Sequence, residues 1–292
     1  MAESTQKDNF ELTWLPKKAF EILVNLPWKE IEQNRAEVIR QAGKTVEIKG
    51  FRKGMAPEKM VEQYLGPQKL LELTLQRIIP DYYQNAVQEL SLNPIITPKI
   101  QLVSTEEGKD WQVKFISCVH PDVNLGNYKE ELKRVKPKEE IWTPGKEEKK
   151  EEKKEKENRD EKINESITWL LANAKLEICE LLVEEEVRRR LSGLLDQTQK
   201  LGITVEQYLS SVGKTIEQLR EEYAKGAEDN LALEFILEKI ADEEKIEVMP
   251  EELEKIMSSA KNEEEKKALE GQKYILATMI RRQKTLDFLG SL

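Results

Sequence analysis

The sequence predicts an α+β N-terminal domain, a four-stranded antiparallel sheet with helices, followed by an all-α C-terminal domain with helical arms. Apolar residues alternate with a period of two before residue 27 and again between residues 95 and 119, which is typical of strands. Between these regions, and beyond residue 163, apolar residues recur at helical spacing. Charged residues make up 35 % of the chain and hydrophobic residues 38 %, which favours long amphipathic helices over one thick core. We expect a first domain at 1–136, a charged linker at 137–162 and a helical domain at 163–292.

The N-terminal domain begins with a predicted hairpin. Phe10, Leu12 and Trp14 alternate with polar residues, and the same period returns in the run from residue 20 to residue 26. The turn residues Pro16-Lys17-Lys18 separate the two runs, and two such runs across a short turn predict paired strands.

Three helices are predicted in the middle of this domain. Pro27 opens the first, because its missing N–H costs nothing in the first turn. Pro57 opens a short second helix, which Gly66-Pro67 separates from a long third helix with Pro80 inside it. Two final strands are expected near residues 95–103 and 111–119, so that helices are inserted between two pairs of strands.

The predicted linker has a distinct composition. Residues 146–156 are almost entirely Glu and Lys and have no apolar face. Such a run forms either a solvated helix held by ion pairs four residues apart or a disordered tether, and the sequence leaves both readings open.

The C-terminal domain is predicted to be helical to its end. Thr204 with Gln207, and Thr215 with Gln218, form capping-box patterns that mark two helix starts. Pro250 opens a further helix. Several separate helices with short links indicate arms or a bundle.

Composition excludes several classes of function. The net charge of −9 means that any RNA contact needs a local basic patch. Cys118 and Cys179 lie in no CxxC pair and are expected to be free thiols. The single histidine, His120, has no Cys or carboxylate residues at the sequence spacing of a metal site, and no Ser/His/Asp grouping surrounds it. We expect no catalytic residue, no metal ligand, no cofactor and no membrane span. A polar N-terminus without an apolar signal core favours the cytoplasm.

One motif carries the functional hypothesis: Gly50-Phe51-Arg52-Lys53-Gly54, between two helical segments. The glycines allow sharp turns, and between them stand a large apolar ring and two cations. A tip of this kind suits docking to a protein–RNA surface, where the ring supplies buried area and the cations meet carboxylates or phosphates. The alternative is an ordinary loop with Phe51 folded back into the core.

This motif belongs to the stretch from Val46 to Pro57, which resembles the ribosome-binding signature of the trigger factor family. The resemblance continues in the first half of the chain through Tyr64-Leu65-Gly66, Asn93-Pro94 to Pro98 and Pro121-Asp122-Val123. Looser resemblances are present in the second half: Leu181 to Val187, Leu219 to Tyr223 and Gln283 to Leu289. Cys179 departs from the proline that is common in the family, which affects only the angle at which a helix begins.

The resemblance implies a ribosome-associated chaperone. Residues 50–54 would contact the large ribosomal subunit, both a protein beside the exit tunnel and rRNA, and the helical domain would hold nascent or unfolded polypeptides. Trigger factors usually carry a prolyl isomerase domain of the FK506-binding type between the two halves. Only the Glu/Lys run lies between Val135 and Ile163, so we expect no isomerase activity. Whether the free protein forms a homodimer is left open.

Client contacts need dispersed apolar residues on a charged surface. The candidates, each of which has core packing as its alternative, are Leu191, Leu195, Leu201, Tyr208, Met257, Ile275 and Met279. The rival interpretations are a prolyl isomerase or hydrolase, a scaffold or holdase without ribosome contact, and a periplasmic chaperone. A turnover assay on a proline-containing peptide tests the enzyme interpretation, and sedimentation with large ribosomal subunits tests the scaffold or holdase interpretation. The polar N-terminus, which has no apolar signal core, disfavours a periplasmic chaperone.

Overall fold

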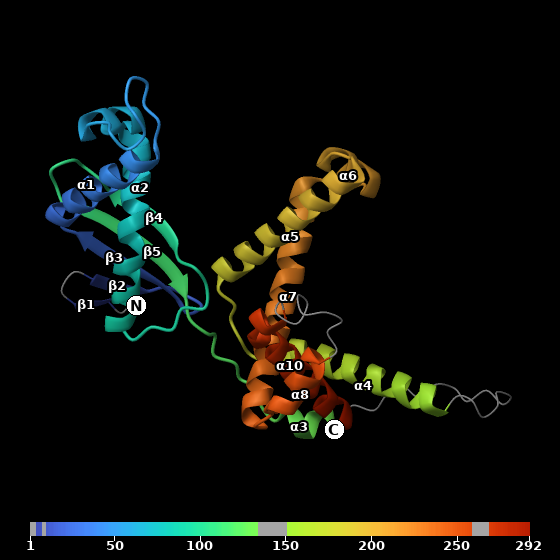
Figure 1. Ribbon diagram of the computed structural model, residues 1–292. Helices are drawn as coiled ribbons and strands as arrows, with labels where there is room; N and C mark the ends of the chain where they lie inside the picture. Colours follow the sequence, from blue (N-terminus) through green and yellow to red (C-terminus); the bar gives the residue numbers. More distant parts are fainter. Residues whose placement is uncertain (1–3, 8–9, 134–150, 259–268) are drawn as a thin grey trace. The chain divides into compact units, whose positions relative to one another are not determined.

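The computed structural model describes residues 4–7, 10–133, 151–258 and 269–292 (Figure 1). The chain divides into two compact units, Met1–His120 and Pro121–Leu292. The first unit is α+β and the second is helical, as the sequence predicts.

A five-stranded antiparallel sheet forms the base of the first unit, in the order β1-β2-β3-β5-β4. Four strands lie where the sequence predicts them: β2 Phe10–Trp14, β3 Ala19–Leu26, β4 Lys99–Ser104 and β5 Trp111–Cys118. The fifth, β1 Ser4–Lys7, pairs with β2 and corrects the predicted count of four. Its sequence, STQK, has no apolar alternation, so pairing with β2 rather than local pattern defines this strand.

The turn between β2 and β3 confirms the predicted hairpin. Lys17 and Lys18 both have a positive φ, 58° and 59°. Positive φ at two successive turn residues matches the right-handed twist of the strands that flank a tight hairpin. The pairing of Phe10 with Val24 and of Leu12 with Ile22 then places the apolar side chains of both strands on the same face.

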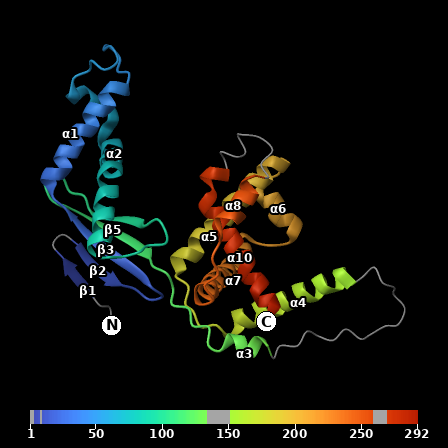
Figure 2. The same ribbon diagram turned by 60° about the horizontal axis from the view of Figure 1, so that its bottom comes forward.

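A helical hairpin packs on this face and extends beyond the sheet (Figures 1 and 2). It consists of α1 Trp28–Thr45 and α2 Glu58–Glu89, joined by the loop that carries the glycine-bounded motif. Gly66 interrupts α2 with non-helical angles, φ 71° and ψ 165°, which confirms the predicted break before Pro67. The helical turns before Gly66 are therefore a short helix, as expected.

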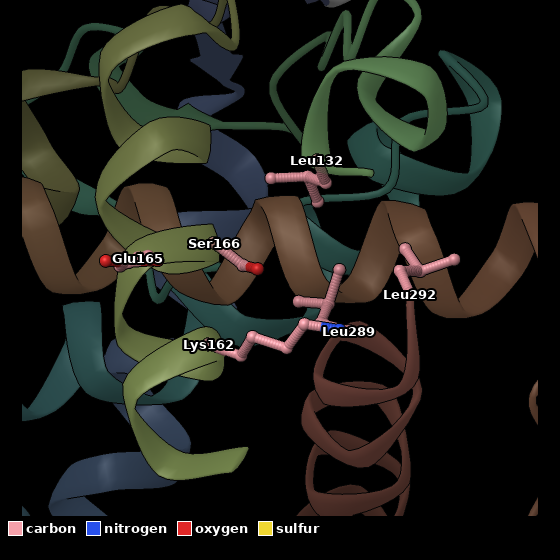
Figure 3. Close-up of a pocket in the computed structure, with 6 residues that line it drawn as sticks. All are labelled: Leu132, Lys162, Glu165, Ser166, Leu289 and Leu292. Carbon is pink, nitrogen blue, oxygen red and sulfur yellow. The ribbon is translucent and has the colours of Figure 1, made fainter. Parts of the chain in front are cut away.

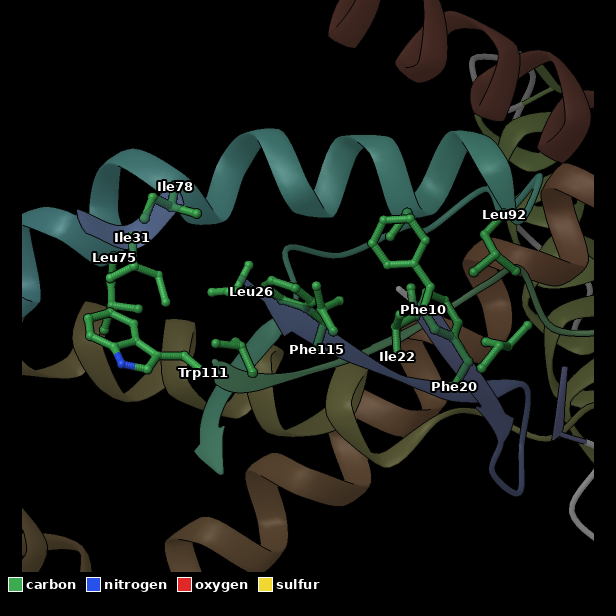
Figure 4. Packing of buried hydrophobic residues seen from close by; sticks show 14 residues of the cluster. Phe10, Phe20, Ile22, Leu26, Ile31, Leu75, Ile78, Leu92, Trp111 and Phe115 are labelled. Carbon is green, nitrogen blue, oxygen red and sulfur yellow. The ribbon is translucent and has the colours of Figure 1, made fainter. Parts of the chain in front are cut away.

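Two apolar clusters hold the first unit together. The larger cluster lies between the sheet and α2 and includes the fully buried Phe20, Ile22 and Phe115 (Figure 4). The smaller cluster lies between the helices near the loop and consists of Val38, Ile39, Val61 and Leu70. The hairpin therefore has its own core next to the tip.

The second unit contains the helices α3 Tyr128–Leu132, α4 Glu151–Asn173, α5 Glu180–Leu201, α6 Val205–Val212, α7 Ile216–Glu243, α8 Pro250–Met257 and α10 Lys273–Ser291. Both predicted capping boxes are present: the Thr204 and Thr215 hydroxyls accept hydrogen bonds from the backbone N–H of Gln207 and Gln218. α5 and α7 pack along each other with α6 at their far end, which forms an arm (Figure 1).

The second core joins segments that are distant in sequence. Leu170 of α4, Ile236 of α7 and Leu289 of α10 are buried together. Figure 3 shows a crevice where α3, α4 and α10 meet, lined by Leu132, Lys162, Glu165, Ser166, Leu289 and Leu292. Arg159 on α4 forms an ion pair with Asp287 on α10, at 3.0 Å between Nη2 and Oδ1.

The division between the units differs from the predicted boundary at residue 136. Leu125, Tyr128 and Leu132 pack in the core of the second unit, and the Tyr128 hydroxyl donates to Glu244 at 2.8 Å. These apolar side chains need a core to cover them, and the helices of the second unit supply it. The start of α4 lies within the predicted linker at 137–162 and is helical from residue 151, while residues 134–150 lie outside the described part of the chain.

Candidate docking site at the tip of the helical hairpin

The loop between α1 and α2 is built from two consecutive turns. The Phe51 N–H donates to the Ile48 carbonyl at 3.0 Å, and the Met55 N–H donates to the Arg52 carbonyl at 2.9 Å. Gly50 and Gly54 have φ values of 94° and 83°, which side chains with a Cβ rarely adopt. Both glycines of the motif are therefore required by the backbone path that presents residues 51–53.

Residues other than Phe51 anchor the loop to the hairpin. Ile48 and Ala56, one on each side of the motif, are partly buried against the small cluster of Val38 and Val61. Phe51 is not part of that cluster and keeps 40 % of its surface exposed. The alternative in which Phe51 folds into the core is therefore wrong, although the ring is partly covered by its neighbours.

Arg52 and Lys53 are both exposed. Neither side chain has an ion pair or hydrogen bond with any residue in the described part of the chain. The segment from residue 44 to residue 59 contains five cations and two carboxylates, a net charge of +3 within a chain of −9. These seven residues are Lys44, Lys49, Arg52, Lys53, Lys59, Glu47 and Glu58. The tip is thus the local basic patch that contact with an acidic or phosphate surface needs.

The structure adds apolar residues that the sequence analysis did not select. Met55 is 73 % exposed, and Met60 and Tyr64 are exposed on the first turns of α2. Met60 and Tyr64 are four residues apart and so lie next to each other on one side of the helix. Their spacing is visible in the sequence, but only the buried position of Val61 shows that this side of α2 faces away from the cluster.

Polar contacts join the two helices of the hairpin to each other and to the β4–β5 turn. Arg35 on α1 forms ion pairs with Glu62 on α2 at 2.7 Å and with Glu107 in the β4–β5 turn at 2.8 Å. The Tyr82 hydroxyl donates to Glu30 at 2.5 Å, and burial together with this hydrogen bond raises the pKa of Tyr82. This hydrogen bond joins α2 to the first turn of α1.

The predicted client-contact residues of the second unit divide into two groups. Leu195, Leu201, Ile275 and Met279 are exposed, whereas Leu191, Tyr208 and Met257 are half-buried. Tyr274, on the same helix as Ile275, is also exposed and was not predicted. The exposed group is available for contact with another polypeptide.

The described residues contain no group of three or more His, Cys, Asp or Glu side chains placed to hold a metal ion. Cys118 and Cys179 are buried and in the thiol form, one in each unit. No helix in the described ranges is long and apolar enough to cross a membrane.

Comparison with known proteins identifies the family. The model for the bacterial trigger factor protein matches residues 9–156, and the model for the trigger factor C-terminus matches residues 146–291. The first match covers more than half of the chain, and the chain belongs to the trigger factor family. The two matches overlap, so no further segment lies between them.

Individual relatives agree with this assignment. The chain is 41 % identical over 105 residues to a trigger factor of Desulforamulus reducens, a match to 34 % of this chain and 24 % of that protein. A trigger factor of Pelotomaculum thermopropionicum is 34 % identical over 113 residues, covering 39 % of this chain and 26 % of that protein. The chain thus spans about a quarter of the length of the curated relatives it matches.

A solved structure, from work on promiscuous substrate recognition in the folding and assembly activities of the trigger factor chaperone, shares the fold. Its TM-score is 0.63 at 16 % sequence identity, and the match covers 100 % of this chain and 99 % of that chain.

Proposed function

We propose that this protein is a ribosome-associated chaperone of the cytoplasm that docks near the polypeptide exit tunnel and holds nascent or unfolded chains. One observation carries the proposal: the partly exposed Phe51 ring and two exposed cations stand on a glycine-bounded tip with its own core beneath it. Membership of the trigger factor family supports the same role.

The chemistry of the tip favours a protein–RNA surface as partner. Phe51 offers an apolar anchor for a pocket, and anchors of this kind carry most of the binding energy of an interface. Arg52 and Lys53 meet carboxylates or RNA phosphates, which form charge-assisted hydrogen bonds with such cations. Because the net charge of the chain is −9, this contact depends on the local charge of the tip rather than on the whole molecule.

The holding of clients is assigned to the second unit. Leu195, Leu201, Ile275 and Met279 offer separate exposed apolar contacts on helices that are otherwise rich in charge. Dispersed contacts bind unfolded segments weakly, so that clients also leave. If this role is right, the protein lowers the light scattering of an aggregating unfolded protein; unchanged scattering contradicts it.

Prolyl isomerase activity is not part of the proposed function. The two family matches overlap at residues 146–156, which leaves no residues between them for an isomerase domain. Turnover of a proline-containing peptide above the uncatalysed rate contradicts this part of the proposal.

Co-sedimentation with isolated ribosomal subunits tests the docking role. The protein is expected to pellet with large subunits and to remain in the supernatant with small subunits. Binding is expected to weaken as salt rises, because the cations of the tip are exposed and therefore screened. Absence from the large-subunit pellet at low salt contradicts docking and favours a holdase or scaffold that acts away from ribosomes.

A further inference from the structure

Large exposed apolar side chains gather in two places in the described residues of the first unit. One place is strand β4, and the other is the end of the helical hairpin, between residues 51 and 64. At this end, Phe51 and Met55 lie in the loop, and Met60 and Tyr64 lie on the first turns of α2. Exposed apolar residues that occur singly are normal, whereas a group of them indicates contact with another molecule.

Met60 and Tyr64 form an apolar stripe along α2. They are four residues apart, so they lie on the same side of the helix, about 6 Å apart along its axis. Tyr64 is 61 % and Met60 is 38 % exposed, whereas the neighbouring Val61 is 1 % exposed and packs in the small cluster. The stripe is therefore open to solvent, while the adjacent side of the helix is buried.

The five residues of the tip are too few to form a specific interface by themselves. Such interfaces bury roughly 800 Å² on each partner and involve about 20–30 residues a side. An anchor such as Phe51 also contributes fully only when surrounding contacts exclude water from it. A docking surface therefore extends from the tip onto neighbouring side chains, and Met55, Met60 and Tyr64 are the exposed apolar ones that follow the tip in the chain.

The chemistry of this surface suits a folded protein better than RNA. Aromatic residues, Met and Arg are the residue types that are enriched in protein–protein interfaces. Thioether side chains adapt to irregular apolar pockets, but they donate no hydrogen bond to a phosphate. The exposed Lys59 and the two tip cations are interspersed with these apolar residues in the sequence. The complementary surface is thus an apolar groove rimmed by carboxylates.

We propose that Met55, Met60 and Tyr64 form a second docking contact, which adds to that of Phe51 in the interface with a folded large-subunit protein. The proposal rests on the ribosome docking role and extends it to residues outside the glycine-bounded motif. In this arrangement the tip provides the anchor and the cations, and the three additional side chains provide apolar area that excludes water around them.

Two matched triple variants of the full chain test the apolar character of this contact by co-sedimentation with large subunits. The polar variant combines Met55→Gln, Met60→Gln and Tyr64→Gln, and the apolar variant combines Met55→Leu, Met60→Leu and Tyr64→Phe. The polar variant is expected to bind about tenfold more weakly or worse, because it places polar groups without partners in the interface. The apolar variant is expected to stay within about threefold of wild type. Circular dichroism and urea unfolding verify that both variants are folded.

The salt dependence of binding distinguishes this contact from the cations of the tip. Neither triple variant changes a charge, so both are expected to keep the wild-type slope of affinity against salt concentration. Replacing Arg52 and Lys53 with alanine is expected to flatten the slope, because interactions of exposed charges are screened by salt. A flatter slope in the polar variant would mean that its substitutions disturb the whole tip, and it would overturn the proposal of a separate contact.

Cross-linking from position 64 identifies the partner of the second contact. A photoreactive phenylalanine derivative in place of Tyr64 is expected to cross-link to the same large-subunit protein as one in place of Phe51. Gln76, exposed on α2 where that helix packs on the sheet, is the control position and is expected to give no cross-link. Cross-links from position 64 to rRNA alone, or to a nascent chain alone, overturn the assignment of the partner.

The outcomes separate this proposal from the docking role itself. If the wild type does not pellet with large subunits, the docking role fails and the second contact fails with it. If the wild type binds, the alanine variant of residues 51–53 does not, and the polar variant binds like the wild type, then only the second contact is overturned. Equal weakening by the polar and apolar variants also overturns it, since the apolar character of the three side chains would then have no effect.

Discussion

Replacing Phe51, Arg52 and Lys53 together with alanine is expected to abolish co-sedimentation with large ribosomal subunits. The variant removes the aromatic anchor and both cations of the tip. An interface centre of this kind contributes about 2 kcal/mol or more, so affinity is expected to fall at least thirtyfold. The free energy of unfolding should change by only about 1 kcal/mol or less, because the three side chains lie largely outside the cluster that anchors the loop.

A matched control for the tip variant lies on the second unit. Lys200, Leu201 and Arg220 are exposed, and their joint replacement with alanine removes two cations and one large apolar side chain away from the tip. This control is expected to bind ribosomes like the wild type. If the tip variant also binds undiminished, residues 51–53 are not the docking site.

Replacing Phe115 with alanine is expected to destabilise the first unit by about 3–5 kcal/mol, the usual cost of removing a buried ring. Phe115 is 0 % exposed and packs against Tyr83, with 5.2 Å between ring centroids. Hydrogen exchange with peptide resolution measures the effect. Peptides from β3 and β5 should exchange faster, and peptides from α7 and α10 should keep wild-type protection, because those helices belong to another core.

Phe51→Ala is the natural comparison for Phe115→Ala, since it removes the same ring from an exposed position of the same unit. Phe51→Ala is expected to lower the free energy of unfolding by about 1 kcal/mol or less. It should leave the protection of β3 and β5 from hydrogen exchange unchanged. Equal destabilisation by the two variants would mean that Phe51 is part of the core. Faster exchange in α7 on Phe115→Ala would mean that the two units unfold together.

Local chemistry in the sequence predicted much of this fold. The break at Gly66-Pro67 depends on the backbone freedom of glycine and on the restrictions of proline. The helix starts at Thr204 and Thr215 depend on side chains three residues away. Each of these features is decided within a few residues, and each is present in the structure.

Features that depend on distant partners could not be predicted. β1 has a polar sequence and becomes a strand only by pairing with β2. Leu125 and Leu132 follow the last strand in sequence, and only the position of α4 and α10 shows that they belong to the second core. For the tip, the motif was visible, but the exposure of Phe51 depends on Ile48 and Ala56 reaching the hairpin core instead.

Site-specific cross-linking from position 51 on isolated ribosomes tests the docking proposal most directly. A photoreactive residue in place of Phe51 is expected to cross-link to a large-subunit protein beside the exit tunnel, while the same residue in place of Leu201 is not. Cross-links from both positions to many ribosomal proteins, or none from position 51, would contradict the docking of this tip at the exit tunnel.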